Sequence, residues 1–343
     1  MLDFINLGLP PITTALLELA FDAGSPIIEN TCASFGVVLL FIQRGNNLKI
    51  TNIHNVPETL VKLAKTNDYS KNADYSVTEI ISPPRIQRLR KIHFKQMQTD
   101  VSDMLWQMLG TALHNVAEKS QVKNHVNEER LVCKIEGVTL SGAIDVQIVN
   151  GNKVSVIDYK FCSSFSVTDI KPEWETQLNI YGWLINKVKG LEIDKLQICA
   201  LIRDWTRSKL LDKYEYPKAP IQVLDIPLWD LKKTEDYISS RIRLHKESKL
   251  SSDLGEELPL CSDEERWQRP TKYAVMKKGA KRAVKLFDDL EVATKVCNEK
   301  KEGDFYVEQR KGEPVRCTGN YCGVAEWCSQ FKKTALDKDV GAL

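Results

Sequence analysis

The sequence contains no apolar run long enough to cross a membrane and no large excess of one charge. The longest apolar stretch spans residues 35–42, far short of the ~20 residues that a membrane helix needs. A basic segment followed by a cleavable apolar segment is also missing near the start, so we expect a cytoplasmic protein without a membrane partner. With 48 basic and 46 acidic side chains, the net charge of +2 excludes a polycation that coats nucleic acid over its whole surface.

Repeats and low-complexity tracts are likewise missing, and 43% apolar with 27% charged residues is typical of a folded globular protein. Charge divides the chain, because residues 1–47 carry a net −3 and the remainder a net +5. We expect three regions: an N-terminal appendage over 1–47, a core over 48–250, and a basic, cysteine-rich region over 251–343 that closes onto the core. Two stretches, 80–99 and 269–287, contain basic residues and no acid.

Hydrophobic periodicity predicts an α/β fold with a mixed central sheet flanked by helices. Residues 101–119, 173–189 and 228–247 have helical spacing, whereas 130–136, 138–149, 152–161 and 195–203 are typical of strands. The dipeptide Asn150-Gly151 between two of these strands predicts a hairpin with a two-residue type I′ turn. That turn would pair Val149 with Asn152.

The hairpin carries two carboxylates and a lysine on one face, because side chains alternate along a strand. In the expected register Asp145 lies opposite Val156, so Asp145 and Asp158 are diagonal neighbours, with Lys160 on the same face. Carboxylate oxygens suit Mg²⁺ or Mn²⁺, which acidify a water molecule and offset charge on a phosphate. Lys160 could orient that water or stabilise the phosphate. The alternative is an ordinary polar face of an exposed sheet.

These residues, in this order, resemble the PD-(D/E)XK nuclease superfamily. The motifs are G-x-x-D at Gly142 and Asp145, D-Y-K at 158–160, and Q-x-x-x-Y at Gln177 and Tyr181. The upstream stretch from Gly110 to Glu118 is similar to the histidine motif of the RecB-like branch. SVTEIISPPRIQRLR, with the C-terminal cysteines, looks most like phage-encoded members, which would place the protein in the host cytoplasm.

The resemblance implies a restriction-endonuclease-like fold and a role for each matching residue. Asp145, Asp158 and the Tyr159 carbonyl oxygen would hold the metal, with His114 as a further ligand that accompanies use of Mn²⁺. Lys160 would be the catalytic lysine, and Gln177 and Tyr181 would contact the DNA backbone. Glu118 would match the acid that the superfamily carries on a helix. Ile144 stands where the literal Pro-Asp motif has proline, as is common in this branch.

Nine cysteines form a high, odd and unevenly placed set, which favours a metal site over disulfides. Cys317, Cys322 and Cys328 lie within twelve residues, and Cys261 or Cys32 could supply a fourth thiolate; we prefer Cys261. Four thiolates suit a structural zinc ion or a [4Fe–4S] cluster. In the RecB-like branch a distant cysteine joins three near the C-terminus to hold an iron–sulfur cluster. The alternative is a group of reduced, buried thiols.

The sequence therefore predicts a metal-dependent DNA nuclease, most simply an exonuclease in phage or bacterial recombination, repair or replication. A non-catalytic DNA-binding subunit of a recombination or helicase complex and a structure-specific endonuclease are the alternatives. Polarity, oligomeric state and partner stay open. The two acid-free stretches would follow DNA phosphates, or else form solvated surfaces. The residues expected to bind DNA are Arg85, Arg88, Arg90, Lys91, Lys277, Lys278, Lys281 and Arg282.

Overall fold

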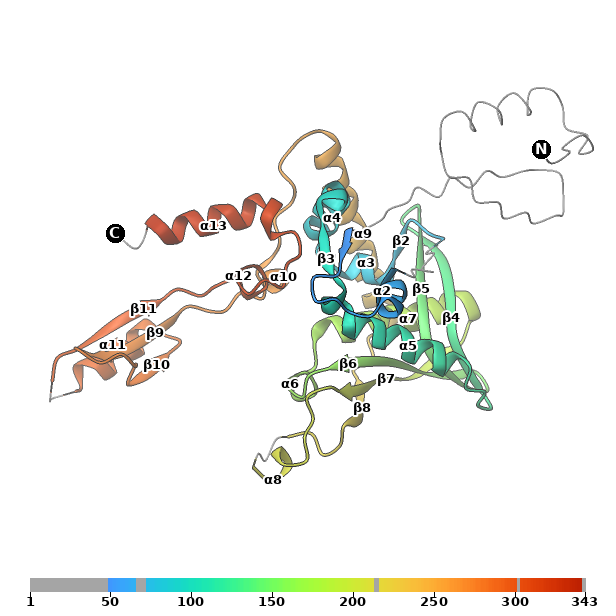
Figure 1. Ribbon diagram of the computed structural model, residues 1–343, viewed down its shortest axis with the longest axis horizontal. Helices are drawn as coiled ribbons and strands as arrows, with labels where there is room; N and C mark the ends of the chain where they lie inside the picture. The colour runs from blue at the N-terminus through green and yellow to red at the C-terminus, as the bar shows by residue number, and fades with distance from the viewer. Residues whose placement is uncertain (1–48, 66–71, 213–215, 301–302, 341–343) are drawn as a thin grey trace, which may run out of the picture. The chain divides into compact units, whose positions relative to one another are not determined.

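A computed structural model describes residues 49–65, 72–212, 216–300 and 303–340 of the chain (Figure 1). The expectations for residues 1–47, Cys32 among them, lie outside this part. A six-stranded sheet runs in the order β2-β5-β6-β7-β8, with β4 on the other edge of β5. Its strands are β2 (Tyr75–Ser76), β4 (His125–Ile135), β5 (Val138–Asn150), β6 (Lys153–Cys162), β7 (Glu192–Ile202) and β8 (Ile221–Ile226).

The sheet is mixed, as the sequence predicts. Strands β2 and β5 pair in parallel, and so do β6 and β7, whereas the remaining pairs are antiparallel. The helices of this part of the chain are α2 (Glu58–Lys65), α3 (Val77–Ile81), α4 (Pro84–His93), α5 (Leu105–Glu118), α6 (Phe165–Thr168), α7 (Pro172–Lys189), α8 (Lys209–Asp212) and α9 (Leu231–Asp253). Short 3₁₀ turns cover Phe94–Gln96 and Val101–Met104.

The hairpin between β5 and β6 forms one residue away from its predicted position. Asn150 pairs with Lys153, so the turn is Gly151-Asn152, with Gly151 at a φ of 62°. Val156 consequently lies opposite Gln147, and the expected pairing of Asp145 with Val156 is wrong. The ladder ends at Val146 opposite Ile157, one residue before Asp145 and Asp158. Since each strand shifts by one residue relative to the turn, Asp145 and Asp158 move from diagonal to facing positions and stay on the same side of the sheet.

Strand β5 changes neighbours around Asp145. Its first half pairs with β2 at Leu140 and Ser141, and its second half pairs with β6 from Val146 onward. Strand β4 follows the other edge throughout, so residues 142–145 form the fork where β2 gives way to β6. At the fork the side chain of Asp145 replaces a ladder bond, because its Oδ2 accepts the Tyr159 N–H at 2.7 Å.

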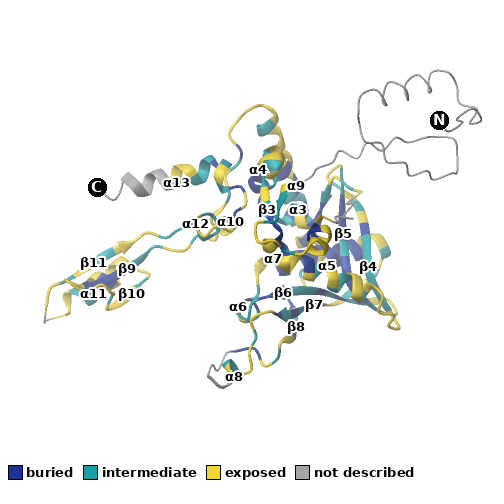
Figure 2. Cartoon of the chain, viewed as in Figure 1, coloured by how far each residue is buried: buried dark blue, intermediate teal, exposed yellow. Residues whose placement is uncertain are grey.

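Helix α7 is the central helix of the core. Proline at its first position and Gly190, at a φ of 70° after its last, set its two ends. Every residue from Thr176 to Ile185 is buried, and Trp174 and Trp183 are packing residues (Figure 2). A Cβ at Gly142 would lie 2.8 Å from Leu184 Cδ1, so the glycine of the G-x-x-D motif allows α7 to approach β5 closely.

The C-terminal region adds a small antiparallel sheet in the order β10-β9-β11, and β1 (Lys49–Thr51) pairs with β3 (Gln98–Asp100). The remaining elements are β9 (Lys272–Lys277), β10 (Lys285–Phe287), β11 (Phe305–Arg310), α10 (Asp263–Arg266), α11 (Leu290–Asn298), α12 (Val315–Thr318), a 3₁₀ turn at Ala325–Trp327, and α13 (Ser329–Val340). Among the described helices, none combines the length and apolarity required to span a bilayer.

Candidate active site

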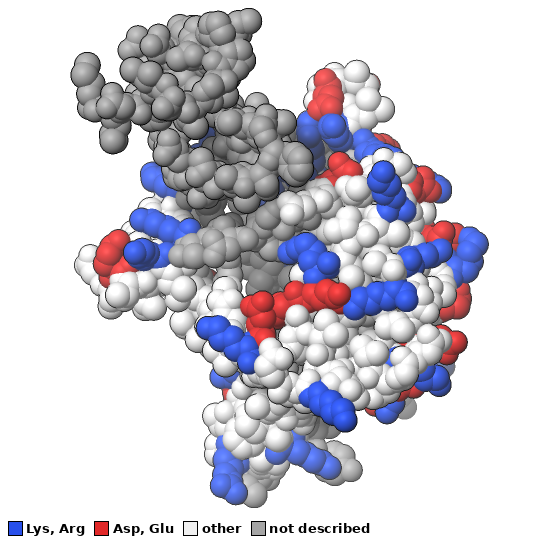
Figure 3. Space-filling view, turned by 90° about the vertical axis from the view of Figure 1, so that its right-hand side faces the viewer, with Lys and Arg blue, Asp and Glu red and all other residues white. Residues whose placement is uncertain are grey.

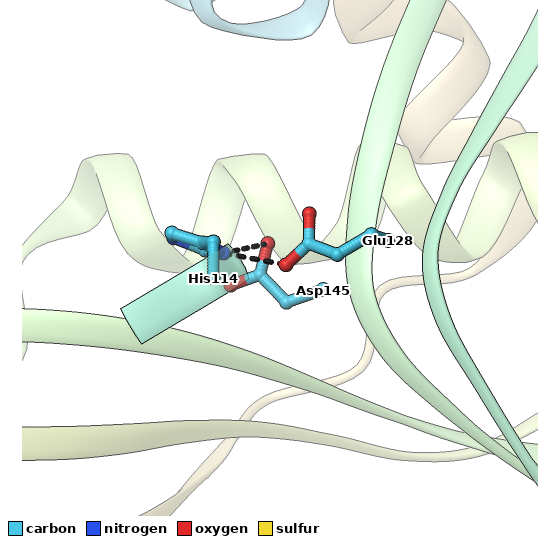
Figure 4. Close-up of side chains that lie close together, drawn as sticks. All are labelled: His114, Glu128 and Asp145. Carbon is cyan, nitrogen blue, oxygen red and sulfur yellow. Dashed lines mark hydrogen bonds and ion pairs between the residues drawn. The ribbon is translucent and has the colours of Figure 1, made fainter. Parts of the chain in front are cut away.

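Three side chains at the fork could hold a metal ion. His114 from α5, Glu128 from β4 and Asp145 from β5 place their ligand atoms within 4.8 Å of one another (Figure 4). His114 Nδ1 lies 2.6 Å from Glu128 Oε1 and 3.7 Å from Asp145 Oδ1. Hydrogen bonding to Glu128 raises the pKa of His114, and the nearby Asp145 and Asp158 act in the same direction. The predicted pair His114 and Asp145 is thus brought together by elements far apart in sequence.

Glu128 is the member of this group that the sequence analysis missed. It stands where β4 passes the fork, between the pairs Asn127–Val146 and Glu129–Ile144. Its backbone is left-handed, with a φ of 50°, a conformation that costs a residue with a Cβ about 1–2 kcal/mol. Such strain is retained where the surrounding structure requires it, commonly at functional sites. A single glutamate in a strand has no motif, so only the fold reveals it.

Asp158 and Lys160 complete the site on β6. Asp158 is 2% exposed, and its Oδ2 lies 2.6 Å from Lys160 Nζ but has no partner in hydrogen-bond geometry. Burial first, and then the charge of Asp158, raise the pKa of Asp145 to about 7. Buried carboxylates that repel one another are stabilised by a cation. The donor set of carboxylates and one imidazole therefore fits Mg²⁺ or, with the histidine, Mn²⁺.

The other motif residues are placed differently from the expectations. Gln177 and Tyr181 are 7% and 4% exposed, and Gln177 Nε2 donates to Tyr181 Oη at 2.8 Å. Here the two side chains are buried and bonded to each other, and their contact with the DNA backbone stays a prediction. Glu118 is exposed at the last position of α5, and Glu128 occupies the acidic position beside His114. Tyr159 supplies its N–H to Asp145, and its ring lies edge-on to His114.

The first basic stretch contains a second correction. Arg85 was expected to bind DNA, but it is 2% exposed and donates to Leu258 O, Glu257 and Ser329. Arg88 pairs with Asp253 and Lys91 pairs with Glu79, whereas Arg90 is exposed. The second stretch is open to solvent, since Lys277, Lys278, Lys281 and Arg282 are all exposed. On the face drawn in Figure 3, acidic and basic side chains are interspersed.

The four preferred cysteines meet in one place. Cys261, Cys317, Cys322 and Cys328 line a common cavity with Arg85, Ile86 and Leu89 of α4. Arg85 Nε donates to Cys328 Sγ at 3.3 Å, and burial, aided by Glu265 and Cys328, raises the pKa of Cys261 to about 12. Cys133, Cys162 and Cys199 lie on strands of the large sheet.

Comparison with known proteins identifies the family of this chain. The model of the PD-(D/E)XK nuclease superfamily matches residues 51–329. The chain belongs to the PD-(D/E)XK nuclease superfamily. It is similar to the solved crystal structure of SSO0001, at 22% identity over 55% of this chain and 85% of that chain, with a TM-score of 0.38. A comparison with curated proteins finds no match.

Proposed function

We propose that the protein is a Mg²⁺- or Mn²⁺-dependent DNA exonuclease of the RecB-like branch, acting in phage or bacterial recombination, repair or replication. The observation that carries this proposal is the junction of His114, Glu128 and Asp145 beside Asp158 and Lys160. Such a site would hydrolyse phosphodiester bonds, with DNA as the substrate that the superfamily implies.

Each residue has a distinct task in this proposal. Glu128 holds the imidazole of His114 through Nδ1, and the Tyr159 N–H fixes the orientation of Asp145. These two interactions preorganise the ligands, with Asp158 as the remaining carboxylate. A bound cation would acidify a water molecule and offset phosphate charge. Lys160, 2.6 Å from Asp158, presents a positive charge where negative charge develops during cleavage.

Cleavage of linear duplex, circular duplex and single-stranded DNA, with Mg²⁺ or Mn²⁺, tests the proposal. An exonuclease degrades only the linear molecules, whereas an endonuclease also opens circles. Asp158→Asn should lower the rate by at least about 10²-fold, the size expected when a charge-stabilising group is lost. Asp225→Asn, a carboxylate exchange at an exposed position on β8, is the control. Binding without any cleavage would identify a non-catalytic subunit instead.

The cysteines support a second part of the proposal, a [4Fe–4S] cluster that fastens the C-terminal region to α4. Tetrahedral zinc at ~2.3 Å from sulfur holds thiolates about 3.8 Å apart. Among the described residues, the one group of three or more possible ligand atoms within 4.8 Å of one another consists of His114, Glu128 and Asp145. No three sulfur atoms of the described cysteines form such a group, so the thiols are spaced more widely than a single zinc ion requires. A cubane cluster is larger and takes four separated thiolates.

Visible absorbance and an iron assay distinguish iron–sulfur from zinc. Cys261→Ser should lose the cluster and lower the melting temperature before the divalent-metal site is affected, whereas Cys297→Ser, on α11 outside the cavity, should not. Cys32→Ser should retain the iron–sulfur cluster. A triple serine variant of Cys317, Cys322 and Cys328 with full stability and full activity would contradict this assignment.

A further inference from the structure

An exposed tryptophan and an arginine lie together near the carboxyl ends of β6 and β7. Trp106, in the first turn of α5, is 42% exposed, and the guanidinium of Arg203 lies 4.9 Å from the centre of its ring. Arg203 immediately follows β7, and its N–H donates to Cys162 O, the last residue of β6, at 2.9 Å. The tryptophan–arginine pair is therefore fixed to the strand that carries Asp158 and Lys160.

The separation of this pair from the candidate metal site follows from two elements independently. Trp106 precedes His114 by eight residues of one helix, which corresponds to about 12 Å. Asp158 precedes Cys162 by four residues of one strand, about 13 Å. A strand with phosphates ~3.4 Å apart along a duplex axis, and farther apart when extended, covers this distance in about two to four nucleotides.

The segment that follows β6 adds an aromatic and a basic side chain. Phe165, on the short helix after β6, is 73% exposed. Lys171 and Arg203 both lie near enough to Cys162 to oppose the rise in the pKa of its thiol that burial causes. The nearby acid, Asp204, is occupied in the fold, since its carboxylate accepts from the amide and the hydroxyl of Ser164. Negative phosphates and flat bases are complementary to such a surface.

We propose that Trp106 and Arg203 form a stacking platform for the bases of single-stranded DNA, two to four nucleotides from the scissile phosphate. This inference rests on the proposed nuclease function and names the form of DNA that the site accepts. Bases stack on aromatic rings and on guanidinium planes alike, irrespective of sequence, and phosphates pair with the adjacent cations. Paired bases in an intact duplex cannot use the platform, so it selects unpaired ends.

The test measures anisotropy of a labelled twelve-nucleotide oligothymidylate, with Ca²⁺ in place of the catalytic metal. Trp106→Leu removes the ring and should weaken binding about tenfold, whereas Trp106→Phe retains a ring and should bind within about threefold of the original protein. Trp267→Leu is the matched control, because Trp267 is 40% exposed and carries Arg316 5.0 Å from its ring, but follows the acidic helix α10. Trp267→Leu should bind the oligothymidylate like the original protein. Trp106→Leu should bind blunt duplex DNA like the original protein.

Cleavage kinetics separate this inference from the proposed function. With Mg²⁺ or Mn²⁺, Trp106→Leu should raise KM for the twelve-nucleotide strand about tenfold while kcat stays unchanged. Arg203→Gln, which keeps the ring, should also raise KM, and covers the case in which Trp106→Leu does not fold. Unchanged binding in both variants, or an equal loss in Trp267→Leu, would overturn the platform. An original protein that binds through Trp106 yet cuts nothing would overturn the nuclease function alone.

Discussion

Glu128 combines backbone strain with a proposed role in holding His114, so its replacement should change stability and activity in ways that separate the two. Its φ of 50° costs any residue with a Cβ about 1–2 kcal/mol, whereas glycine adopts this conformation freely. Glu128→Ala and Glu128→Gly both remove the carboxylate beside His114. Only the glycine variant also releases the strain, so it should be more stable than the alanine variant by about 1 kcal/mol.

Lys134 provides the matched position in the same strand. It is exposed, and its φ is not among the positive ones, so glycine there should be less stable than alanine by about 0.5–1 kcal/mol. The order of the two variants thus reverses between positions 128 and 134. Thermal unfolding resolves this, since 1 kcal/mol shifts the melting temperature by about 2–4 °C in domains of this size.

Activity supplies the second measurement. Loss of the Glu128 carboxylate removes the group that holds His114 Nδ1, so both variants should bind Mn²⁺ about 10- to 100-fold more weakly and cleave DNA correspondingly slowly. If glycine at 128 were less stable than alanine, as at 134, the left-handed backbone would be refuted. If both variants cut DNA at the original rate and metal concentration, Glu128 would not belong to the metal site.

Three further outcomes follow from other parts of the structure. Burial, together with the charge of Arg241, lowers the pKa of His245 from about 6.5 in the unfolded chain to about 4. Unfolding therefore takes up a proton at pH values between these two, and about 3 kcal/mol of stability, complete above pH 6.5, should disappear as pH falls toward 4. Urea titrations of His245→Gln should show a flatter pH dependence. Gly142→Ala should destabilise the fold by about 1–3 kcal/mol by pushing on Leu184, whereas Gly110→Ala, with open space around it, should stabilise α5 by up to about 1 kcal/mol in the same melts. Replacing the four exposed cations of 277–282 by alanine should reduce the slope of log affinity against log salt for single-stranded DNA by up to about 3, and an unchanged slope would exclude that loop from DNA contact.

Local periodicity was sufficient to predict most of the fold. The helical spacing of 173–189 and the alternation around Asp145 and Asp158 identify elements that the structure reproduces within a few residues. The turn at Gly151 was misplaced by one residue, because asparagine-glycine and glycine-asparagine both suit a two-residue loop. The shared face of the two carboxylates survived this error, since shifting both strands together preserves the alternation.

The failures have a common physical cause, which is that a side chain's environment is set by residues far away in sequence. In the sequence Arg85 lies among other basic residues and resembles a solvated cation, but its acceptors, Glu257 and Leu258, come from more than 170 positions downstream. A buried guanidinium requires such partners, and no local pattern announces them. The helix motif of α5 similarly pointed to Glu118, four residues from His114, whereas the neighbouring strand provides Glu128 at 2.6 Å.

Contacts with residues far away in sequence also determine which basic side chains are available to DNA. Of the four cations predicted in the first stretch, Arg85 is enclosed and Arg88 and Lys91 pair with acids. The four of the second stretch are exposed at the end of β9 and on the connection that follows it, and of these Lys278 lies 3.7 Å from the carboxylate of Asp304. A buried arginine contributes stability rather than phosphate binding, so Arg85→Met should lower the melting temperature without reducing the salt slope. The four-alanine variant of 277–282 should reduce the salt slope without lowering the melting temperature. We therefore expect the salt dependence of DNA binding to arise mainly from the second stretch, although sequence counting gives both stretches equal weight.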